Sequence, residues 1–205
     1  MSAVIRRLFA LPRRFSGVAR DAPVRHNRAV KDVPGVVIKR LDSIGEDQIQ
    51  GLAELLVDSV EDDAGVGFMF PLELATAEAF WRGIASGVAT GARALLVAED
   101  ETGIVGTVQL LLAQPENQPH RADLAKMMVL RRARRRGIGA ALMLAAEGVA
   151  RTAGKTLLVL DTWTGSDAGR LYTRLGWVRV GEIPGFALMA RGGLWGTTVY
   201  YRELG

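Results

Sequence analysis

The sequence contains no cysteine and only two histidines, His26 and His120. Without cysteine, the chain has no disulfide, no thiolate metal site and no cysteine nucleophile. Two histidines so far apart also argue against a zinc site. No apolar run approaches the roughly 20 residues that a membrane-spanning helix needs. We therefore expect no metal and no membrane partner.

Positive charge is unevenly distributed along the chain. Residues 1–35 carry eight Lys or Arg and two Asp, a net charge of +6, whereas the other 18 basic and 20 acidic residues give −2. We expect residues 1–35 to be a basic, disordered or cleavable leader and residues 36–205 to form one domain. An arginine-rich, acid-poor leader suits a mitochondrial presequence and equally a bacterial extension. A cytoplasmic location is expected, with a mitochondrial one as the alternative.

Apolar periodicity predicts strands and helices that follow one another from Pro34 and Gly35 onward. Strands are expected at 36–41, 92–99, 103–113, 120–130, 155–161, 177–180 and 197–204, and helices at 47–60, 72–89, 137–154 and 166–175. The continuous apolar run at 155–161 indicates a fully buried strand. A turn at Pro184 and Gly185 and a loop containing Gly192 and Gly193 are expected between the last two strands.

One segment, M-M-V-L-R-R-A-R-R-R-G-I-G-A-A-L-M at 127–143, joins a strand to a helix through arginines and two close glycines. A helix start exposes unpaired N–H groups and a partial positive charge. Gly137 and Gly139 allow a phosphate to approach the backbone, and the arginines raise the local potential. The loop at 134–139 is therefore predicted to hold a pyrophosphate.

Two other phosphate-binding motifs do not fit this loop. A P-loop needs Lys and then Ser or Thr after the second glycine, where Ala140 and Ala141 stand. A dinucleotide-binding loop would follow the first strand and needs a third glycine at the position of Leu142. A solvated arginine run before an ordinary helix remains as the simple alternative, and the order of elements must decide.

The segment R-R-R-G-I-G at 134–139 matches the R-x-x-G-x-G/A motif of the GNAT acetyltransferase superfamily, and it lies where that family has the motif, between the fourth strand and the third helix. Four further segments resemble the tabtoxin-resistance acetyltransferase and its relatives: V-G-F-M at 66–69, H-R-A-D-L-A-K-M-M-V-L at 120–130, L-V-L-D-T at 158–162 and R-V-G-E-I-P-G-F at 179–186. Asp123 stands where those relatives commonly have Glu.

The resemblance covers about residues 36–205. It implies the GNAT fold, an α/β (α+β) class with a central mixed seven-stranded sheet flanked by about four helices. It also implies transfer of an acetyl group from acetyl-CoA, a co-substrate, directly to the amine of a small molecule such as an amino acid or a β-lactam-like toxin. Such an activity would give antibiotic or toxin resistance. The resemblance leaves a homodimer open.

Two alternative functions stay open beside this one. A protein or peptide N-acetyltransferase is the nearer alternative, and a basic nucleic-acid-binding module is the more distant one. Nucleic-acid binding needs arginines spread over a face with aromatic residues between them. Here six of the positive residues crowd into 126–136, most of them in one short loop, so we expect no nucleic-acid partner.

The resemblance also implies which residues contact acetyl-CoA. They are Met128, Val129, Arg134, Arg135, Arg136, Gly137, Ile138, Gly139 and Ala140. Among them, the backbone N–H of Val129 is expected to polarise the thioester carbonyl, because family members open this strand there by a bulge.

Asp123 and Asp161 are acids within otherwise apolar strands that adjoin in this fold. A carboxylate there is costly unless it has a partner or a function. The resemblance implicates both in deprotonating the acceptor amine through water. Simpler interpretations stay open: Asp123 could pair with Arg121, Lys126 or a backbone donor, and Asp161 could bind turn amides at 162–165.

Tyr172, on the helix after the fifth strand, is the residue that the resemblance assigns as the acid for the leaving thiolate, and a core tyrosine is the alternative. His120 is a weaker candidate at the start of the fourth strand, or a surface histidine. Phe68, Phe70 and Trp81 either wall the acceptor pocket or belong to the core.

Overall fold

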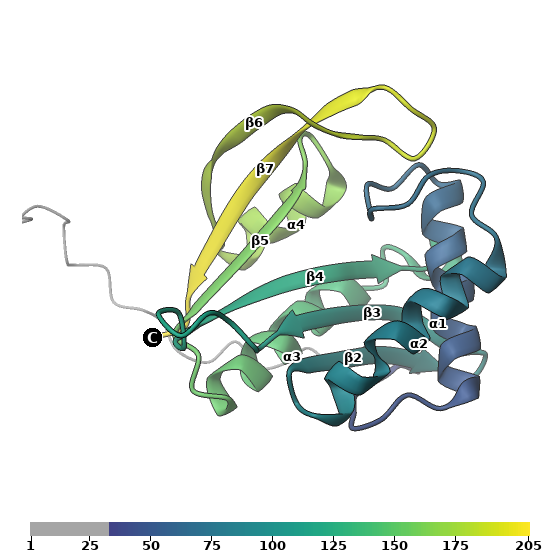
Figure 1. Cartoon of the computed structure of the whole chain (residues 1–205), viewed down its shortest axis with the longest axis horizontal. Coiled ribbons are helices and arrows are strands. Elements are labelled where there is room, and N and C mark those ends of the chain that lie inside the picture. Colours follow the sequence, from purple (N-terminus) through teal and green to yellow (C-terminus); the bar gives the residue numbers. More distant parts are fainter. Residues whose placement is uncertain (1–32) are drawn as a thin grey trace, which may run out of the picture.

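The computed structural model describes residues 33–205, which form one sheet with helices on both faces (Figure 1). The predicted leader lies outside the described residues except for its last three positions. Within 33–205, no helix combines the length and the apolar character that crossing a bilayer requires. The same range contains no group of three or more side chains placed to hold a metal ion.

The order of helices and strands is the predicted one. The strands are β1 (Val37–Leu41), β2 (Arg93–Asp100), β3 (Gly103–Leu111), β4 (Arg121–Val129), β5 (Leu157–Trp163), β6 (Val178–Leu188) and β7 (Leu194–Glu203). The helices are α1 (Glu46–Glu61), α2 (Leu74–Ala89), α3 (Ile138–Thr152) and α4 (Asp167–Leu175), with a 3-10 turn, η1, at Arg131–Ala133.

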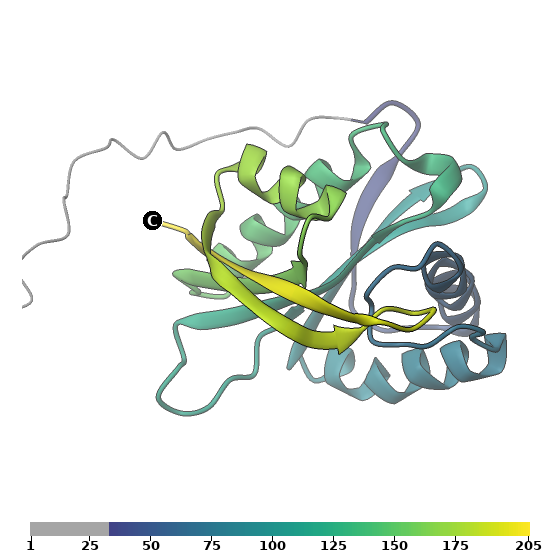
Figure 2. The same ribbon diagram turned by 90° about the horizontal axis from the view of Figure 1, so that it is seen from above.

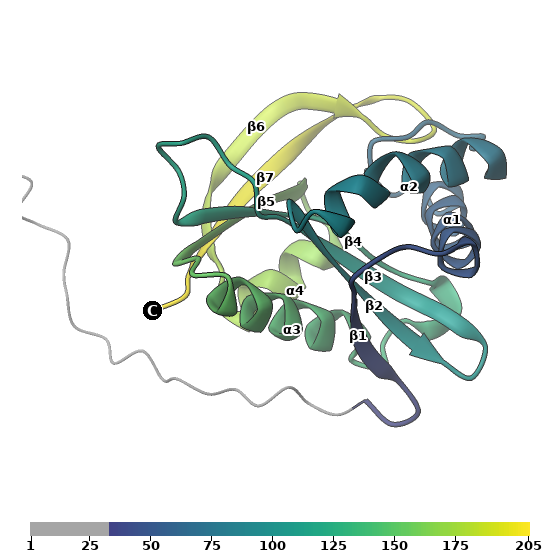
Figure 3. The ribbon, with the colours of Figure 1, turned by 60° about the horizontal axis from the view of Figure 1, so that its bottom comes forward.

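The sheet has the order β1-β2-β3-β4-β5-β7-β6. All neighbours pair antiparallel except β4 and β5, which are parallel, so the predicted mixed seven-stranded sheet with four helices is confirmed. Helices α1 and α2 cover one face and α3 and α4 the other (Figures 2 and 3). The apolar stripes that predicted α1 and α3 form the cores of these two layers, with Leu52, Leu56 and Leu142 fully buried.

Strands β4 and β5 pair over only three positions. The pairs are Arg121 with Leu157, Ala122 with Leu158, and Asp123 with Val159. Both strands continue beyond these pairs, so they diverge toward their carboxyl ends. This divergence opens the sheet at its centre.

The strand at 155–161 was predicted to be fully buried, and this is wrong. In β5, Leu158 and Leu160 are buried under α3 and α4, but Val159 is half-buried and Asp161 is exposed. The reason is that no helix within residues 33–205 covers the other face of β5, where Val159 and Asp161 line a hollow instead.

The penultimate strand is longer than predicted, since β6 continues through the expected turn at Pro184 and Gly185. The pairing with β7 shifts between Ile183 and Ala187, so the two residues lie in an irregularity within the strand. Proline has no N–H to donate, and such irregularities are where a strand accepts it. The actual turn of this hairpin is at Gly192 and Gly193, both with positive φ.

Candidate active site

Two adjoining hollows of about 340 and 350 Å³ lie where β4 and β5 diverge. Asp123 and Asp161 both line the first hollow, and Asp161 and Tyr172 both line the second. The structure therefore brings the three predicted catalytic residues to one opening. The far walls are apolar side chains of the β6–β7 hairpin, which include Phe186, Leu188 and Trp195.

Asp123 has partners on its own side of the opening. Its carboxylate lies 3.2 Å from Arg121 Nη2 and accepts a hydrogen bond of 3.2 Å from the Gln114 side-chain amide. Both Arg121 and Asp123 are partly exposed, so the pair contributes little to stability. The simple interpretation, pairing with Arg121, is present, and it leaves the carboxylate facing the hollow.

Asp161 accepts a hydrogen bond of 2.7 Å from the Thr197 hydroxyl on β7. The alternative that it binds the turn amides at 162–165 is wrong, because the β5–β7 pairing places Thr197 beside it instead. Thr197 is 4% exposed and lines both hollows. No local sequence pattern marks Thr197, since only the pairing of β5 with β7 reveals its position.

Tyr172 is 4% exposed, and its ring packs edge-on against Tyr200 and tilted against Trp177. It thus belongs to the core and also lines the second hollow. Burial, and then the negative charge of Asp161, raise the pKa of the Tyr172 hydroxyl well above its usual value. The Tyr172 hydroxyl is therefore protonated at neutral pH, as the role of proton donor requires.

The bulge in β4 lies at Lys126 and Met127, not at Val129 as predicted. Thr107 of β3 pairs with Met128 of β4, and Gln109 of β3 pairs with Ala125 of β4. Two β4 residues, Lys126 and Met127, therefore lie opposite the single β3 residue Val108. Lys126 takes a left-handed conformation, φ 52°, to make this possible.

The Val129 amide nevertheless faces the opening. The Leu130 N–H donates to Val105 on β3 at 2.9 Å, and consecutive amides in a strand point to opposite sides. Val129 N–H therefore points away from β3, toward the side from which β5 has diverged. An amide in this position can donate to a group in the opening.

Helix α3 begins without a side-chain cap. Gly137 has φ +91°, and the first bond within the helix is from Ala141 N–H to Gly137 carbonyl at 3.1 Å. The amides of the three residues between them, Ile138 to Ala140, are the ones that a helix start leaves without partners. The side chains of Ile138 and Met128 are buried in the core, so only the backbone of Ile138 can face a ligand.

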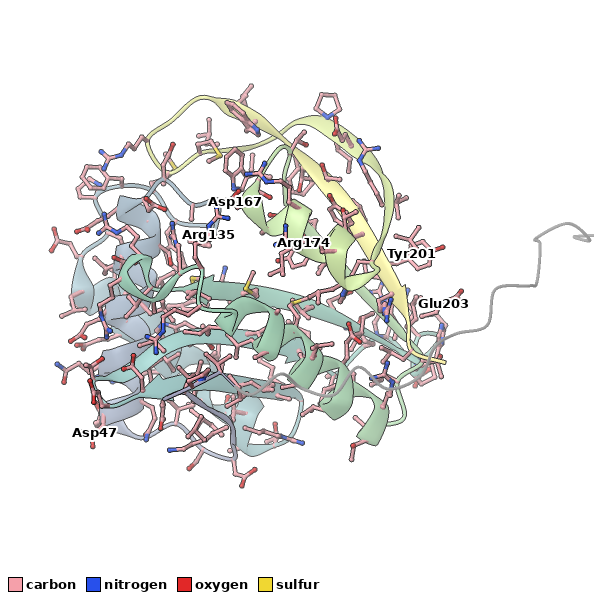
Figure 4. All side chains as sticks on the ribbon, turned by 180° about the vertical axis from the view of Figure 1, so that it is seen from behind. Asp47, Arg135, Asp167, Arg174, Tyr201 and Glu203 are labelled. Carbon is pink, nitrogen blue, oxygen red and sulfur yellow. The ribbon has the colours of Figure 1, made fainter. Side chains whose placement is uncertain are left out.

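The arginines of the loop are paired with carboxylates of neighbouring elements. Arg134 Nη1 lies 2.6 Å from Asp62, and Arg136 Nη1 lies 3.2 Å from Asp100. Arg135 has the most exposed side chain of the three, 87%, and lies 3.5 Å from Asp167 at the start of α4 (Figure 4). Arg135 is therefore the loop arginine most free to turn toward a phosphate.

The remaining candidates are divided between surface and core. His120 is exposed and lines neither hollow, in agreement with a surface histidine. Trp81 is fully buried in the α1–α2 core. Phe70 is 41% exposed, with the Arg191 guanidinium 3.9 Å from its ring centre, and Phe68 packs edge-on against Phe80.

The sequence suggested Lys126 only as one of several clustered positive residues and as a possible partner of Asp123, a place that Arg121 takes in the structure. Lys126 itself lines the second hollow, and its Nζ donates to the Val66 carbonyl at 2.5 Å. Burial, and then the nearby Arg93, lower the pKa of Lys126, while Asp161 opposes this change. A single lysine within the apolar run L-A-K-M-M-V was the signal that could have revealed it.

Known proteins resemble this chain in sequence and in fold. Residues 91–179 match the family model of the acetyltransferase (GNAT) domain. An uncharacterised N-acetyltransferase from the hisH-hisA intergenic region of Azospirillum brasilense is 29% identical over 128 residues, which are 62% of this chain and 74% of that protein.

Solved structures share the fold at low sequence identity. The Salmonella typhimurium protein yncA, solved with its cofactor acetyl-CoA, has a TM-score of 0.68 and 16% identity over 83% of this chain and 95% of that one. A ribosomal-protein-alanine N-acetyltransferase from Brucella melitensis has a TM-score of 0.67 and 21% identity over 82% of this chain and 99% of that one.

The sheet order, the matched residues and these relatives define the class of protein: the chain has the GNAT fold, and residues 91–179 match the acetyltransferase (GNAT) domain. It is an acyl-CoA-dependent N-acetyltransferase.

Proposed function

We propose that this enzyme transfers the acetyl group of acetyl-CoA directly to the amine of a small molecule, such as an amino acid or a β-lactam-like toxin. The observation that carries the proposal is the opening between β4 and β5, where Asp161 lines both hollows and Tyr172 lines the second. A volume of about 350 Å³ is near the lower end of the roughly 300–1,000 Å³ that small-molecule sites have.

The start of α3 fits the pyrophosphate of acetyl-CoA. Three unpartnered amides and the helix dipole favour an anion there, and a side chain at Gly137 would be strained by its positive φ. Arg135 could leave Asp167 for a phosphate at little cost, because their ion pair is long and exposed. Pairing of Arg134 and Arg136 with acidic residues disfavours the nucleic-acid alternative.

Each proton in the reaction has a candidate group. Acetyl-CoA supplies the acyl group as a thioester, and Val129 N–H is placed to donate to its carbonyl oxygen. Asp161, with Asp123 nearby, accepts the proton that the amine loses as its nitrogen bonds to the acyl carbon. Tyr172, which its raised pKa keeps protonated, gives its proton to the sulfur as the carbon–sulfur bond breaks.

A thiol-release assay tests this proposal. Acetyl-CoA would be offered with amino acids, β-lactam amino acids, polyamines and peptides bearing a free amine, and the products identified by mass spectrometry. We expect turnover with a small free amine and an acetylamide product. Turnover with peptides alone would instead support a protein or peptide N-acetyltransferase.

A further inference from the structure

The second hollow is lined by only two charged side chains among the described residues, Lys126 and Asp161. The other lining side chains are uncharged, and several are large and apolar: Met127, Trp163, Phe186, Met189 and Trp195. A ligand that carried one positive and one negative group on a small apolar body would match both charges. An amine with no anionic group would leave Lys126 without a counter-charge.

Lys126 is held firmly in its position. The bulge in β4 turns its backbone, and its Nζ donates to Val66 on the α1–α2 loop. The same Nζ lies 5.6 Å from the ring centre of Phe68 and 5.4 Å from that of Phe80. Cation–π contacts fix the ammonium while leaving its other N–H groups available.

The surroundings of Lys126 also favour an anion. Arg93 is near enough to lower the pKa of Lys126, and the Arg93 guanidinium donates to Gln109, an uncharged side chain, at 3.1 Å. The carboxylate that acts on Lys126 is that of Asp161, which must also serve the acceptor amine. A bound carboxylate would neutralise the excess positive charge.

We propose that Lys126 is a specificity-determining residue that binds the carboxylate of a free amino-acid acceptor, while Asp161 faces the amine of the same molecule. This inference rests on the proposed function and narrows it. A peptide N-terminus, an amino-acid amide or a polyamine presents an amine without a carboxylate beside it. Each should therefore be a poor acceptor.

The test compares each amino acid with its own carboxamide. The ammonium group of the carboxamide is the more acidic, so intrinsic amine availability favours the carboxamide, and a preference for the amino acid cannot arise from it. For the best of the twenty amino acids, we expect kcat/KM to exceed that of its carboxamide by about 10- to 100-fold, the effect of one charge-assisted hydrogen bond.

Lys126→Gln removes the charge but keeps a donor for the Val66 carbonyl, and Lys126→Arg keeps the charge. In Lys126→Gln, the KM for the amino acid should rise while the KM for the carboxamide stays the same, so that the preference for the amino acid is lost. Lys126→Arg should retain part of this preference. Lys155→Met is the matched control, because Lys155 also donates to backbone carbonyls, at 2.9 and 2.8 Å, and lines neither hollow. Its preference should equal that of the wild type.

Equal treatment of acid and carboxamide by the wild type would overturn the inference, as would an equal loss of both activities in Lys126→Gln. If polyamines were the better acceptors, only the role of Lys126 would fail, whereas turnover with peptides alone would overturn both the role of Lys126 and the small-molecule function. If no amine released thiol and calorimetry showed no binding of acetyl-CoA, the proposed function itself would fail.

Discussion

The Arg135 guanidinium lies 3.5 Å from the Asp167 carboxylate and so connects the loop before α3 with the first turn of α4 (Figure 4). Asp167 also pairs with Arg170. In the proposed complex, Asp167 weakens the binding of the pyrophosphate in two ways. Its negative charge repels the anion, and its ion pair with Arg135 competes with the anion for that guanidinium.

Asp167→Asn should therefore bind acetyl-CoA more tightly, by about two- to five-fold, the usual scale of an exposed charge pair. The gain should shrink at high salt. Calorimetry at two ionic strengths measures both effects. Asp47→Asn is the control, since Asp47 likewise stands in the first turn of a helix, α1, away from the loop (Figure 4). Weaker binding by Asp167→Asn would contradict the assignment.

Gly137→Asp should weaken acetyl-CoA binding beyond what strain alone explains. A side chain at φ +91° strains the backbone, although Asn and Asp tolerate the left-handed region better than other residues do. Gly137→Asn carries the same strain and a similar shape without charge, so the two variants differ in Coulomb repulsion alone. We expect the affinity of Gly137→Asp for acetyl-CoA to be lower than that of Gly137→Asn by about tenfold or more. Equal affinities in two folded variants would place the pyrophosphate elsewhere.

Tyr172→Phe should lower kcat by about 10²- to 10⁴-fold if protonation of the thiolate limits the rate. Unfolding temperature and acetyl-CoA affinity should change little, because the ring still packs against Tyr200 and Trp177. Tyr200→Phe is the control, as Tyr200 is also buried and lines neither hollow. Similar kcat values in both variants would make Tyr172 a core residue only.

The pH profile offers a second test of Tyr172. A raised pKa means that the phenol keeps its proton up to and beyond the usual value of about 10. For the wild type, kcat should therefore not decline on the alkaline side below about pH 10 through loss of this proton. A decline near neutral pH that disappears in Tyr172→Phe would show that the hydroxyl must be deprotonated, the opposite of the proposed role.

Asp161→Asn should lose more rate than Asp123→Asn, because Asp123 is already engaged by Arg121 and Gln114 while Asp161 has the Thr197 hydroxyl. Both losses should be largest at low pH, where the acceptor is mostly ammonium and needs a base. Raising the pH supplies free amine and should restore part of the rate. Wild-type pH profiles in both variants would assign the two carboxylates structural roles.

The order of elements could be predicted because each element carries a local signal. The apolar spacing of α1 and α3, and the Ser166 side chain that caps α4 with a 3.0 Å bond to Gly169, are readable from neighbouring residues. The strand β6 shows the limit of such reading. Pro184 and Gly185 have the chemistry of a turn, yet the pairing of Ile183 and Ala187 with β7 on either side keeps them within β6.

The candidate site follows the same rule. Gly137 and Arg135 could be found because the loop that holds them is continuous in sequence. The position of Thr197 beside Asp161 depends on two strands far apart in the chain, and the bulge at Lys126 depends on the register between β3 and β4, which no local pattern shows. Burial of Tyr172 was foreseen as an alternative to catalysis, and the structure shows that a tyrosine can be buried and still line a hollow.

The three-position pairing of β4 with β5 has a consequence for cooperativity. Few backbone hydrogen bonds hold β5, β6 and β7 to the rest of the sheet, so this group can open locally at a smaller free energy than global unfolding. A ligand bound between β4 and β5 would contact both parts. Some of its binding free energy would then oppose that opening, and amides of β5 and β7 would exchange with solvent more slowly as acetyl-CoA saturates the enzyme.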